Sequence, residues 1–381
     1  MKLRRTRMAA GAAAAMLVGL LAIVAGGGRV VAQQNAQPQQ EVQMAEDVLM
    51  NVQVLRGIPL DEFMDTMGMF AAALGYDCSN CHGPQIASGF GGFAVPTPEI
   101  QVARRMVLMM NAINRSYFGG TERVTCFTCH NGDFSPKEAP DLALQYGVPR
   151  TYPNAMAIVP TPGASADQIF DDYLQALGGR EQVAALTSVA ATGTYSGFVT
   201  RFAEIPVEIY AEAPDRRTTI VHELSGEETI TAYDGRNGWR TGPDVPVPVM
   251  ALTGGNQASA RIEAIATFPA SIQEAFSEWE VGTVIIDDGP VTVVQGRVAG
   301  QTPVNFYFDD SDLLVRLVRW NATDVGVVPT QIDYEDYREV SGIRMPFRWT
   351  VTWTGGQSTF ELAEVRTNVP IDASRFARPT R

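Results

Sequence analysis

Two segments of the same pattern, Cys-x-x-Cys-His, account for all four cysteines and two of the three histidines of this 381-residue chain. They span residues 78–82 and 126–130. This spacing is the attachment signature of c-type haem, in which both thiols bond to the haem vinyl groups and the imidazole binds the iron. We therefore predict one compact unit with two covalently bound c-type haems. The attachment residues would be Cys78, Cys81, Cys126 and Cys129, and the axial ligands His82 and His130.

Other interpretations of the cysteines explain less of the pattern. Two disulfides would suit an exported protein but do not require a histidine after each pair. A four-cysteine zinc site leaves both histidines unexplained. A thioredoxin-type redox motif needs a strand-to-helix setting that neither segment shows. The repeated histidine therefore favours haem.

The amino terminus is typical of a secretory signal. Basic residues from Lys2 to Arg7 precede an uncharged apolar stretch that ends near Ala25, and small residues lead up to Ala32. We expect residues 1–32 to be a cleaved signal peptide and the chain to be periplasmic or otherwise extracytoplasmic. The alternative is an uncleaved segment that associates with the membrane, since the stretch is about long enough to span it.

The charge balance excludes some partners. Residues 1–32 hold five of the 29 basic residues and none of the 42 acidic ones, so the rest carries a net charge of −18 (24 basic against 42 acidic). Such a chain is a poor partner for nucleic acid or an anionic membrane. It is compatible with redox partner proteins of basic charge.

The chain changes character near residue 160. Residues 44–155 show helical periodicity around the two motifs, which predicts a mainly α domain. From Ser188 onward the chain alternates apolar and polar side chains between frequent turns, which predicts antiparallel β structure in a second domain of residues 166–381. Residues 156–165 contain a Pro/Gly linker, and the Gln-rich residues 33–43 form a flexible leader.

Several helices can be placed from periodicity and caps. We expect helices over 41–55, over 59–74 and from 97 or 98 to just before Gly119. Asp61 and Glu62 are interpreted as charges of a first helical turn. In the β region, a helix over 166–177 has Ser165 as its N-cap, and a helical interval over 258–276 interrupts the strands.

Each haem iron needs a sixth ligand unless it is a catalytic site. The remaining histidine, His222, lies in a strand pattern and is interpreted as a sheet residue. Methionine is the substitute, and its soft sulfur raises the haem potential relative to a second histidine. Six methionines lie in the helices ahead of the motifs: Met64, Met67, Met69, Met106, Met109 and Met110. The alternative is that they fill a core.

Other residues near the motifs have two interpretations each. Arg104, Arg105 and Arg123 are candidate partners of the haem propionates, with solvated surface as the alternative. Tyr76 and Phe127 are candidates for packing on the porphyrin, with ordinary core packing as the alternative.

Residues 44–135 also carry a set of longer matching segments. They are Asn51–Leu55, Thr66-Met67, Leu74-Gly75, Ala103–Met106, Asn114 and Val124–His130. Together they resemble the photosynthetic reaction-centre cytochrome c subunit family. In that family a helix methionine ligates the iron of the motif that follows. The resemblance implies Met67 for the haem at His82 and Met106 for the haem at His130, with Met109 and Met110 as alternatives to Met106.

The departures from that family matter as well. Its members usually bind four haems, whereas this chain has two motifs and then continues into the β region. The implied protein is a dihaem variant, and a role in photosynthesis does not follow.

The β region has its own resemblance. Residues 169–179, 337–347 and 368–370 look similar to the lipoprotein-carrier (LolA-like) half-barrel family. This implies a curved sheet with packed helices, whose apolar concave face would hold a lipid or acyl ligand or dock a partner. The predicted fold class is therefore multidomain, a mainly α dihaem cytochrome c module followed by an antiparallel β half-barrel.

Three functions fit these features. The leading one is an exported dihaem cytochrome that carries electrons without catalysis, with the β domain for docking or anchoring. The second is a dihaem peroxidase-type enzyme, which needs one iron with an open distal site. The third is a carrier of a hydrophobic ligand with an accessory haem domain.

Overall fold

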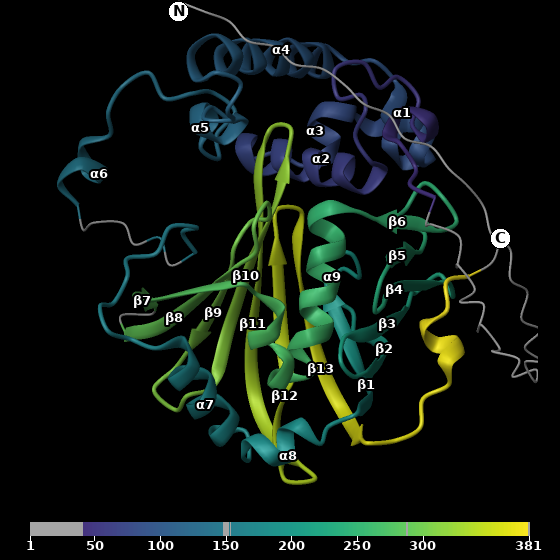
Figure 1. Cartoon of the computed structure of the whole chain (residues 1–381). Helices are drawn as coiled ribbons and strands as arrows, with labels where there is room; N and C mark the ends of the chain where they lie inside the picture. Colours follow the sequence, from purple (N-terminus) through teal and green to yellow (C-terminus); the bar gives the residue numbers. More distant parts are fainter. Residues whose placement is uncertain (1–40, 148–151, 153, 287–288, 380–381) are drawn as a thin grey trace, which may run out of the picture. The chain divides into compact units, whose positions relative to one another are not determined.

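The C-terminal half of the chain is built on one antiparallel sheet of thirteen strands (Figure 1). The structure is a computed structural model that describes residues 41–147, 152, 154–286 and 289–379. The predicted signal segment 1–32 and most of the predicted leader 33–43 lie outside the described residues. Among the described residues, no helix has both the length and the apolar character needed to cross a bilayer.

The strands follow one another as a meander with a single crossover. Their order in the sheet is β6-β5-β4-β3-β2-β1-β13-β12-β11-β10-β9-β8-β7. They are β1 (Ser188–Gly197), β2 (Ile205–Glu212), β3 (Arg216–His222), β4 (Glu228–Asp234), β5 (Gly238–Thr241), β6 (Met250–Leu252), β7 (Glu278–Ile286), β8 (Gly289–Arg297), β9 (Val304–Phe308), β10 (Leu314–Thr323), β11 (Gly326–Val340), β12 (Ile343–Trp353) and β13 (Gly356–Thr367).

The first and last strands meet in the middle of this sheet, where Val189 of β1 lies opposite Thr367 of β13. The edges are therefore β6 and β7, and the chain passes between them through helix α9 (Gly254–Ala266). Helix α9 packs on β3, β4 and β5 from one arm of the sheet and on β10 from the other, so the sheet curves around it (Figure 1). An antiparallel sheet with packed helices is what the sequence predicts.

One apolar core fills the concave side of the sheet. Helices α7 (Ala166–Ala176) and α8 (Arg180–Ala184) contribute to it from one end, together with α9. Phe170 of α7 lies 6.1 Å from Phe306 and 5.7 Å from Phe308 between ring centroids. Ser165 caps α7 as predicted, since its Oγ accepts the amide of Gln168 at 3.4 Å. Three short 3-10 helices complete this part: η3 (Pro269–Ser271), η4 (Gln273–Ala275) and η5 (Ala373–Phe376).

Helices surround the two motifs in the N-terminal part. They are α1 (Ala45–Val48), α2 (Leu60–Leu74), α3 (Cys78–His82), η1 (Pro84–Ser88), η2 (Phe90–Ala94), α4 (Pro98–Phe118), α5 (Cys126–His130) and α6 (Leu142–Tyr146). Helices α2 and α4 agree with the prediction. Each ends at a glycine in the left-handed conformation, Gly75 at φ 66° and Gly119 at φ 62°.

The helix predicted over 41–55 is wrong, because only Ala45–Val48 is helical. In place of a longer helix, the backbone around Gln43 and Ala45 pairs with the segment at the start of α2, around Ile58 and Leu60. The amide of Ala45 donates to the carbonyl of Ile58 (3.0 Å), and that of Leu60 donates to Gln43 (2.9 Å). These cross-segment bonds use backbone groups that a longer helix would pair internally.

The predicted linker 156–165 lies alongside the edge strand β7 in space and pairs with it. Pro160 forms an antiparallel bridge with Gly282, and the amide of Thr161 donates to the carbonyl of Val281 at 2.8 Å. The segment is thus bound to the sheet rather than standing free of it.

A buried carboxylate joins α2 to the sheet part. Asp61 is 2% exposed and accepts three hydrogen bonds, from the amide and hydroxyl of Thr253 (2.7 and 2.8 Å) and from Asn256 Nδ2 (3.2 Å). Thr253 is the N-cap of α9, so Asp61 also complements the positive end of that helix dipole. A second contact follows one turn later, where Asn321 Nδ2 of β10 donates to Asp65 (3.1 Å).

The substitution Asp61→Asn tests this contact between α2 and α9. Asn keeps the size of the Asp side chain but removes the negative charge that accepts three hydrogen bonds. We expect the free energy of unfolding to fall by about 1.5–3 kcal/mol, the range for a hydrogen bond to a charged group. Guanidinium unfolding followed by circular dichroism measures it. Asp47→Asn, at an exposed position of α1, is the matched control. Equal losses in the two variants would mean that Asp61 does not hold α2 to α9.

Candidate haem-binding site

Each Cys-x-x-Cys-His segment forms one helical turn closed by the same reciprocal cap. In α3, Asp77 accepts the amides of Ser79 (2.8 Å) and Asn80 (3.2 Å), while Asn80 Oδ1 accepts the amide of Asp77 (2.8 Å). In α5, Thr125 and Thr128 exchange equivalent bonds of 3.2 and 3.0 Å. These are capping boxes. The patterns Asp-x-x-Asn and Thr-x-x-Thr would have revealed them in the sequence.

The caps place the candidate haem residues on one side of each turn. Residues three and four apart on a helix are neighbours, and the cysteines and the histidine of each motif have this spacing. All four thiols are free; Cys78 and Cys129 are exposed, and Cys81 and Cys126 are half-buried. Each turn therefore groups two thiols with one imidazole.

Backbone carbonyls hold both motif histidines. His82 Nδ1 lies 2.9 Å from the carbonyl oxygen of Phe93, and His130 Nδ1 lies 3.1 Å from that of Asp133. Because a carbonyl oxygen only accepts, Nδ1 carries a proton in both rings, and in a neutral ring Nε2 is then the nitrogen with the lone pair. Burial lowers the pKa of His82, which favours the neutral ring. This is the tautomer and the support that a metal-ligating histidine needs.

The candidate methionine helices α2 and α4 carry the same apolar stripe. Phe63, Met67, Phe70 and Leu74 follow one another at i, i+4, i+7 and i+11 in α2, and Val102, Met106, Met109 and Ile113 do so in α4. In both stripes methionine is the second member. The α2 stripe is half-buried, and in α4 Val102 and Met109 are 43% and 47% exposed.

The other methionines differ in their surroundings. Met69 and Met110, 5% and 4% exposed, belong to one apolar cluster together with Val107 and Val325. They face the protein's own core. Met67 is half-buried and packs against the edge of this cluster, whereas the half-buried Met106 lies on a face that the protein covers only in part.

The two motifs interlock with the two methionine helices. Helix α2 packs against α5, and α4 packs against α3. The amide of Gly132 after α5 donates to Ala73 of α2 (2.9 Å), and Thr97 Oγ1 ahead of α4 donates to Cys81 of α3 (2.6 Å). Tyr76 stacks on Phe134 rather than standing free, with ring centroids 5.1 Å apart.

A polar group beside the first motif lacks a partner among the described residues. Arg104 Nη2 donates to the carbonyl of Asn51 (2.6 Å), but its Nη1 is buried without a hydrogen bond. Asn51 in turn donates to the carbonyl of Ala94, next to the Phe93 carbonyl that holds His82. An unpaired buried donor at this place fits an anionic group such as a haem propionate.

Exposed apolar side chains gather in the same part of the chain. Among the described residues, sixteen of the twenty-one exposed large hydrophobic residues lie between positions 42 and 159, Phe127 among them. An apolar prosthetic group would cover such surface. The unpaired donor, the apolar surface and the free thiols together fit haem.

The thiol of Cys126 is the most shielded feature of the second motif. Burial raises its pKa to about 11. Cys126 packs against the apolar cluster that contains Val325. Its amide donates to the carbonyl of Val325, in the turn between β10 and β11 (3.2 Å). No local sequence pattern indicates this contact, which joins residues about two hundred positions apart.

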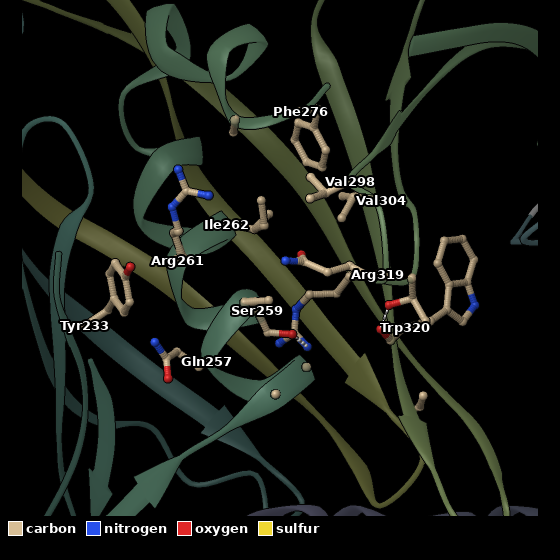
Figure 2. A pocket seen from close by; sticks show the side chains of 18 of the residues that line it. Tyr233, Gln257, Ser259, Arg261, Ile262, Phe276, Val298, Val304, Arg319 and Trp320 are labelled. Atoms are coloured by element: carbon tan, nitrogen blue, oxygen red, sulfur yellow. Dashed lines mark hydrogen bonds between the residues drawn. The ribbon is translucent and has the colours of Figure 1, made fainter. Parts of the chain in front are cut away.

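The sheet part holds a cavity of about 470 Å³ beside α9 and β10 (Figure 2). Phe276, Ile262 and Val304 supply apolar walls. Arg319 donates to Ser259 Oγ (2.7 Å) and to Glu263 (2.8 Å), and its buried Nε has no partner among the described residues. The volume is in the range of pockets for small ligands.

Glu62 of α2 lines the same cavity. Burial, followed by the negative charge of Asp61, raises the pKa of Glu62, and a bond from Thr253 Oγ1 (3.3 Å) opposes the rise. Ionisation of the Glu62 carboxyl is therefore unfavourable at this position, next to the contact between α2 and α9.

His222 lies in β3, as predicted for a sheet residue. Its Nε2 is 3.0 Å from Glu208 Oε1, and its Nδ1 is 3.3 Å from Glu228 Oε1, on the neighbouring strands β2 and β4. These cross-strand contacts give it a structural role away from the two motifs.

The N-terminal part of the chain is similar to proteins of one known family. Residues 22–144 match the family model of the photosynthetic reaction centre cytochrome C subunit. A photosynthetic reaction center cytochrome c subunit from Roseobacter denitrificans is 32% identical over 108 residues, which cover 26% of this chain and 29% of that protein. The resemblance predicted from the motifs is confirmed. The chain spans less than a third of the length of this relative.

The sheet part is similar to other solved structures. A LolA superfamily protein from Nitrosomonas europaea is 14% identical and covers 57% of this chain and 99% of its own, with a TM-score of 0.38. A putative outer membrane lipoprotein-sorting protein domain from Vibrio parahaemolyticus is 9% identical and covers 55% and 94%, with a TM-score of 0.37. The predicted resemblance to lipoprotein carriers agrees with these neighbours.

The raised pKa of Glu62 gives a pH-dependent prediction. The folded chain binds this proton more readily than the unfolded chain, so the contribution of Glu62 to stability falls as pH rises above about 4.3, the pKa of an unperturbed Glu. Glu62→Gln removes this loss. We expect the unfolding free energy of the variant, relative to wild type, to increase between pH 4 and pH 7 in urea titrations. Glu138→Gln, at an exposed position, is the control, and an identical pH profile for both variants would contradict the assignment.

Proposed function

We propose that this chain is an exported dihaem cytochrome c that transfers single electrons between partner proteins. The observation that carries the proposal is the repeated turn, in which two free thiols and an imidazole oriented through its Nδ1 by a backbone carbonyl share one capped helix. The similarity to a protein named as a cytochrome c subunit supports it.

The chain's own residues would hold and orient two c-type haems. Cys78 and Cys81 would bond to one haem, and Cys126 and Cys129 to the other. When bound, haem supplies one-electron exchange between ferrous and ferric iron. The carbonyls of Phe93 and Asp133 orient the two imidazoles, and the free Nη1 of Arg104 is available to a propionate.

Met67 and Met106 are our proposed sixth ligands, as the family resemblance implies. Their matching place in two equal stripes supports this pair over its neighbours. Met110 lies in the apolar cluster, where its sulfur contributes to packing. Met109 lies on the same stripe as Met106 and is more exposed, which makes Met106 the better shielded ligand.

The ligand set favours an electron carrier over a peroxidase-type enzyme. A peroxidase needs an open distal position for its substrate, whereas Met67 and Met106 would each fill that position at one haem. The chain would then leave no place for a substrate at either site, which suits electron transfer.

We place the dihaem module at residues 44–155 and the β domain at 166–381, joined by residues 156–165, in an extracytoplasmic chain. The bond between Asp61 and Thr253 and the contact between Cys126 and Val325 tie the two parts together. Redox proteins of basic surface are the partners that the acidic chain would attract.

Purified protein should contain two haems, both low-spin, with a methionine–iron charge-transfer band in the far red. Met67→Ala and Met106→Ala should each convert one haem to high spin and lower its potential, because each removes one thioether ligand. Met64→Ala and Met109→Ala are the matched controls in α2 and α4 and should leave both haems low-spin. Pyridine haemochrome assays and optical spectra provide the measurements.

Fewer than two haems per chain would overturn the dihaem proposal. A native high-spin haem that reacts with peroxide would favour the enzyme. Loss of low-spin character in Met109→Ala but not in Met106→Ala would move the second ligand to Met109.

A second candidate function is supported by the cavity beside α9. Its apolar walls and the unpaired Nε of Arg319 fit an apolar molecule with an oxygen acceptor at one end, such as a fatty acid. In that case the chain would carry a hydrophobic ligand, with haem as an accessory.

A fluorescent fatty acid tests this candidate on the full chain. If the cavity is a binding site, the probe should bind saturably, and Ala275→Trp, which fills the space next to Phe276, should abolish binding. Leu224→Trp, at an exposed position, is the control for an added indole. Binding that both variants retain would place the probe elsewhere.

A further inference from the structure

The turn between β10 and β11 extends out of the sheet and into the helical part of the chain. Figure 1 shows this hairpin reaching the space between α2 and α5. Val325 at its tip and Val328 in β11 are 0% and 5% exposed, and both lie in the apolar cluster that contains Met69 and Met110. Two of the eight buried residues of that cluster thus come from the sheet.

The fit at the tip is specific. Gly326 has φ 146°, in a region that favours glycine, and an added Cβ would overlap Met69 Cε and approach Thr125 Cβ to 3.2 Å. The hairpin also closes on itself, since Thr323 Oγ1 donates to the carbonyl of Gly326 (2.7 Å). The position of Val325 is therefore determined by close packing on both sides.

The carbonyl of Val325 accepts the amide of Cys126, the first residue of the second motif. A thioether at Cys126 would attach the porphyrin edge to the same residue. The hairpin tip would therefore lie next to that edge, because Val325 is hydrogen-bonded to the residue that carries the thioether.

Asp324, the exposed residue at this tip, brings a negative charge to the same place. Its charge contributes to the raised pKa of Glu122, four residues ahead of Cys126, and to that of Glu62 on α2. Asp324 directly precedes Val325, whose carbonyl accepts the Cys126 amide, so its carboxylate lies close to the second motif.

We propose that the β10–β11 hairpin is a positioning element of the second haem site: Val325 holds Cys126 in place, and the Asp324 carboxylate sets the potential of the haem attached there. This inference rests on the proposed dihaem function and deepens it. The sheet then acts on electron transfer directly, in addition to any docking or ligand role. A negative charge near iron stabilises the ferric form, so Asp324 lowers the reduction potential of that haem.

The charge is tested by Asp324→Asn in the full holoprotein. Potentiometric titration should show one of the two midpoint potentials rising and the other unchanged. Asp310→Asn removes an exposed charge from the other end of β10, in the turn after β9, and should change neither potential. Because Asn retains the size of Asp, a merely structural role of the hairpin would not produce a rise in one potential.

The packing is tested by Gly326→Ala. Displacement of the tip should admit water to the porphyrin edge, which stabilises the ferric form and lowers the same potential that Asp324→Asn raises. The Soret circular dichroism of that haem should change as well. Gly226→Ala, at φ 87° with open space around its Cβ, controls for backbone strain alone.

The outcomes separate this inference from the function on which it rests. Absence of two haems in wild-type protein would overturn the dihaem function itself. Two haems whose potentials are the same in Asp324→Asn and Asp310→Asn would leave that function in place and overturn the role of the hairpin. If Gly326→Ala fails to fold, the Asp324→Asn comparison still decides.

Discussion

Helix α2 packs against three different surroundings at once, and the rest of the structure depends on this. One face contacts the sheet part through Asp61 and Asp65. A second face places Met69 in the apolar cluster shared with the β10–β11 hairpin. The third face, the stripe around Met67, is half-buried: it packs partly against the same cluster, and a prosthetic group would cover the part that stays exposed. The orientation of the stripe is therefore determined by the other two faces.

The sheet part contacts the haem motifs and the helices around them instead of standing apart from them. A β domain joined by a linker would be expected to fold and act separately from the haem motifs. Instead, residues of the sheet part cap and contact both sides of the motif-bearing part: Thr253 binds Asp61 of α2, and Val325 binds Cys126 of α5. In metal sites, supporting contacts of this kind orient the side chains that bind the metal and tune its properties.

Local features of the fold were predictable from the sequence because they depend on neighbouring residues. The alternation in the strands, the Ser165 cap and the glycines at 75 and 119 all act within a few positions. The Cys-x-x-Cys-His turns belong to the same class. The helix over 41–55 failed because its backbone pairs with residues ahead of α2, a competition that periodicity does not register.

Long-range contacts were not predictable, and Asp61 shows why. In the sequence it is a first-turn helix charge, a role that it also has in the structure. Its partner Thr253 lies 192 positions away, and nothing in either local pattern indicates the other. The same holds for Gly326. In the sequence it is an ordinary turn glycine, and only the structure shows that Met69 and Thr125 pack against it.

The need for these supports follows from the size of the motif-bearing core. Six buried residues of the apolar cluster come from the helical part and two from the hairpin, whereas the sheet part has a much larger core of its own. Small units bury too little apolar surface to be stable alone. Haem would cover the remaining apolar stripes, but it is attached only after the thiols are in place. The β10–β11 hairpin and Thr253, both from the sheet part, contact this small unit at Cys126 and at the buried Asp61 of α2, and so give it its geometry before that step.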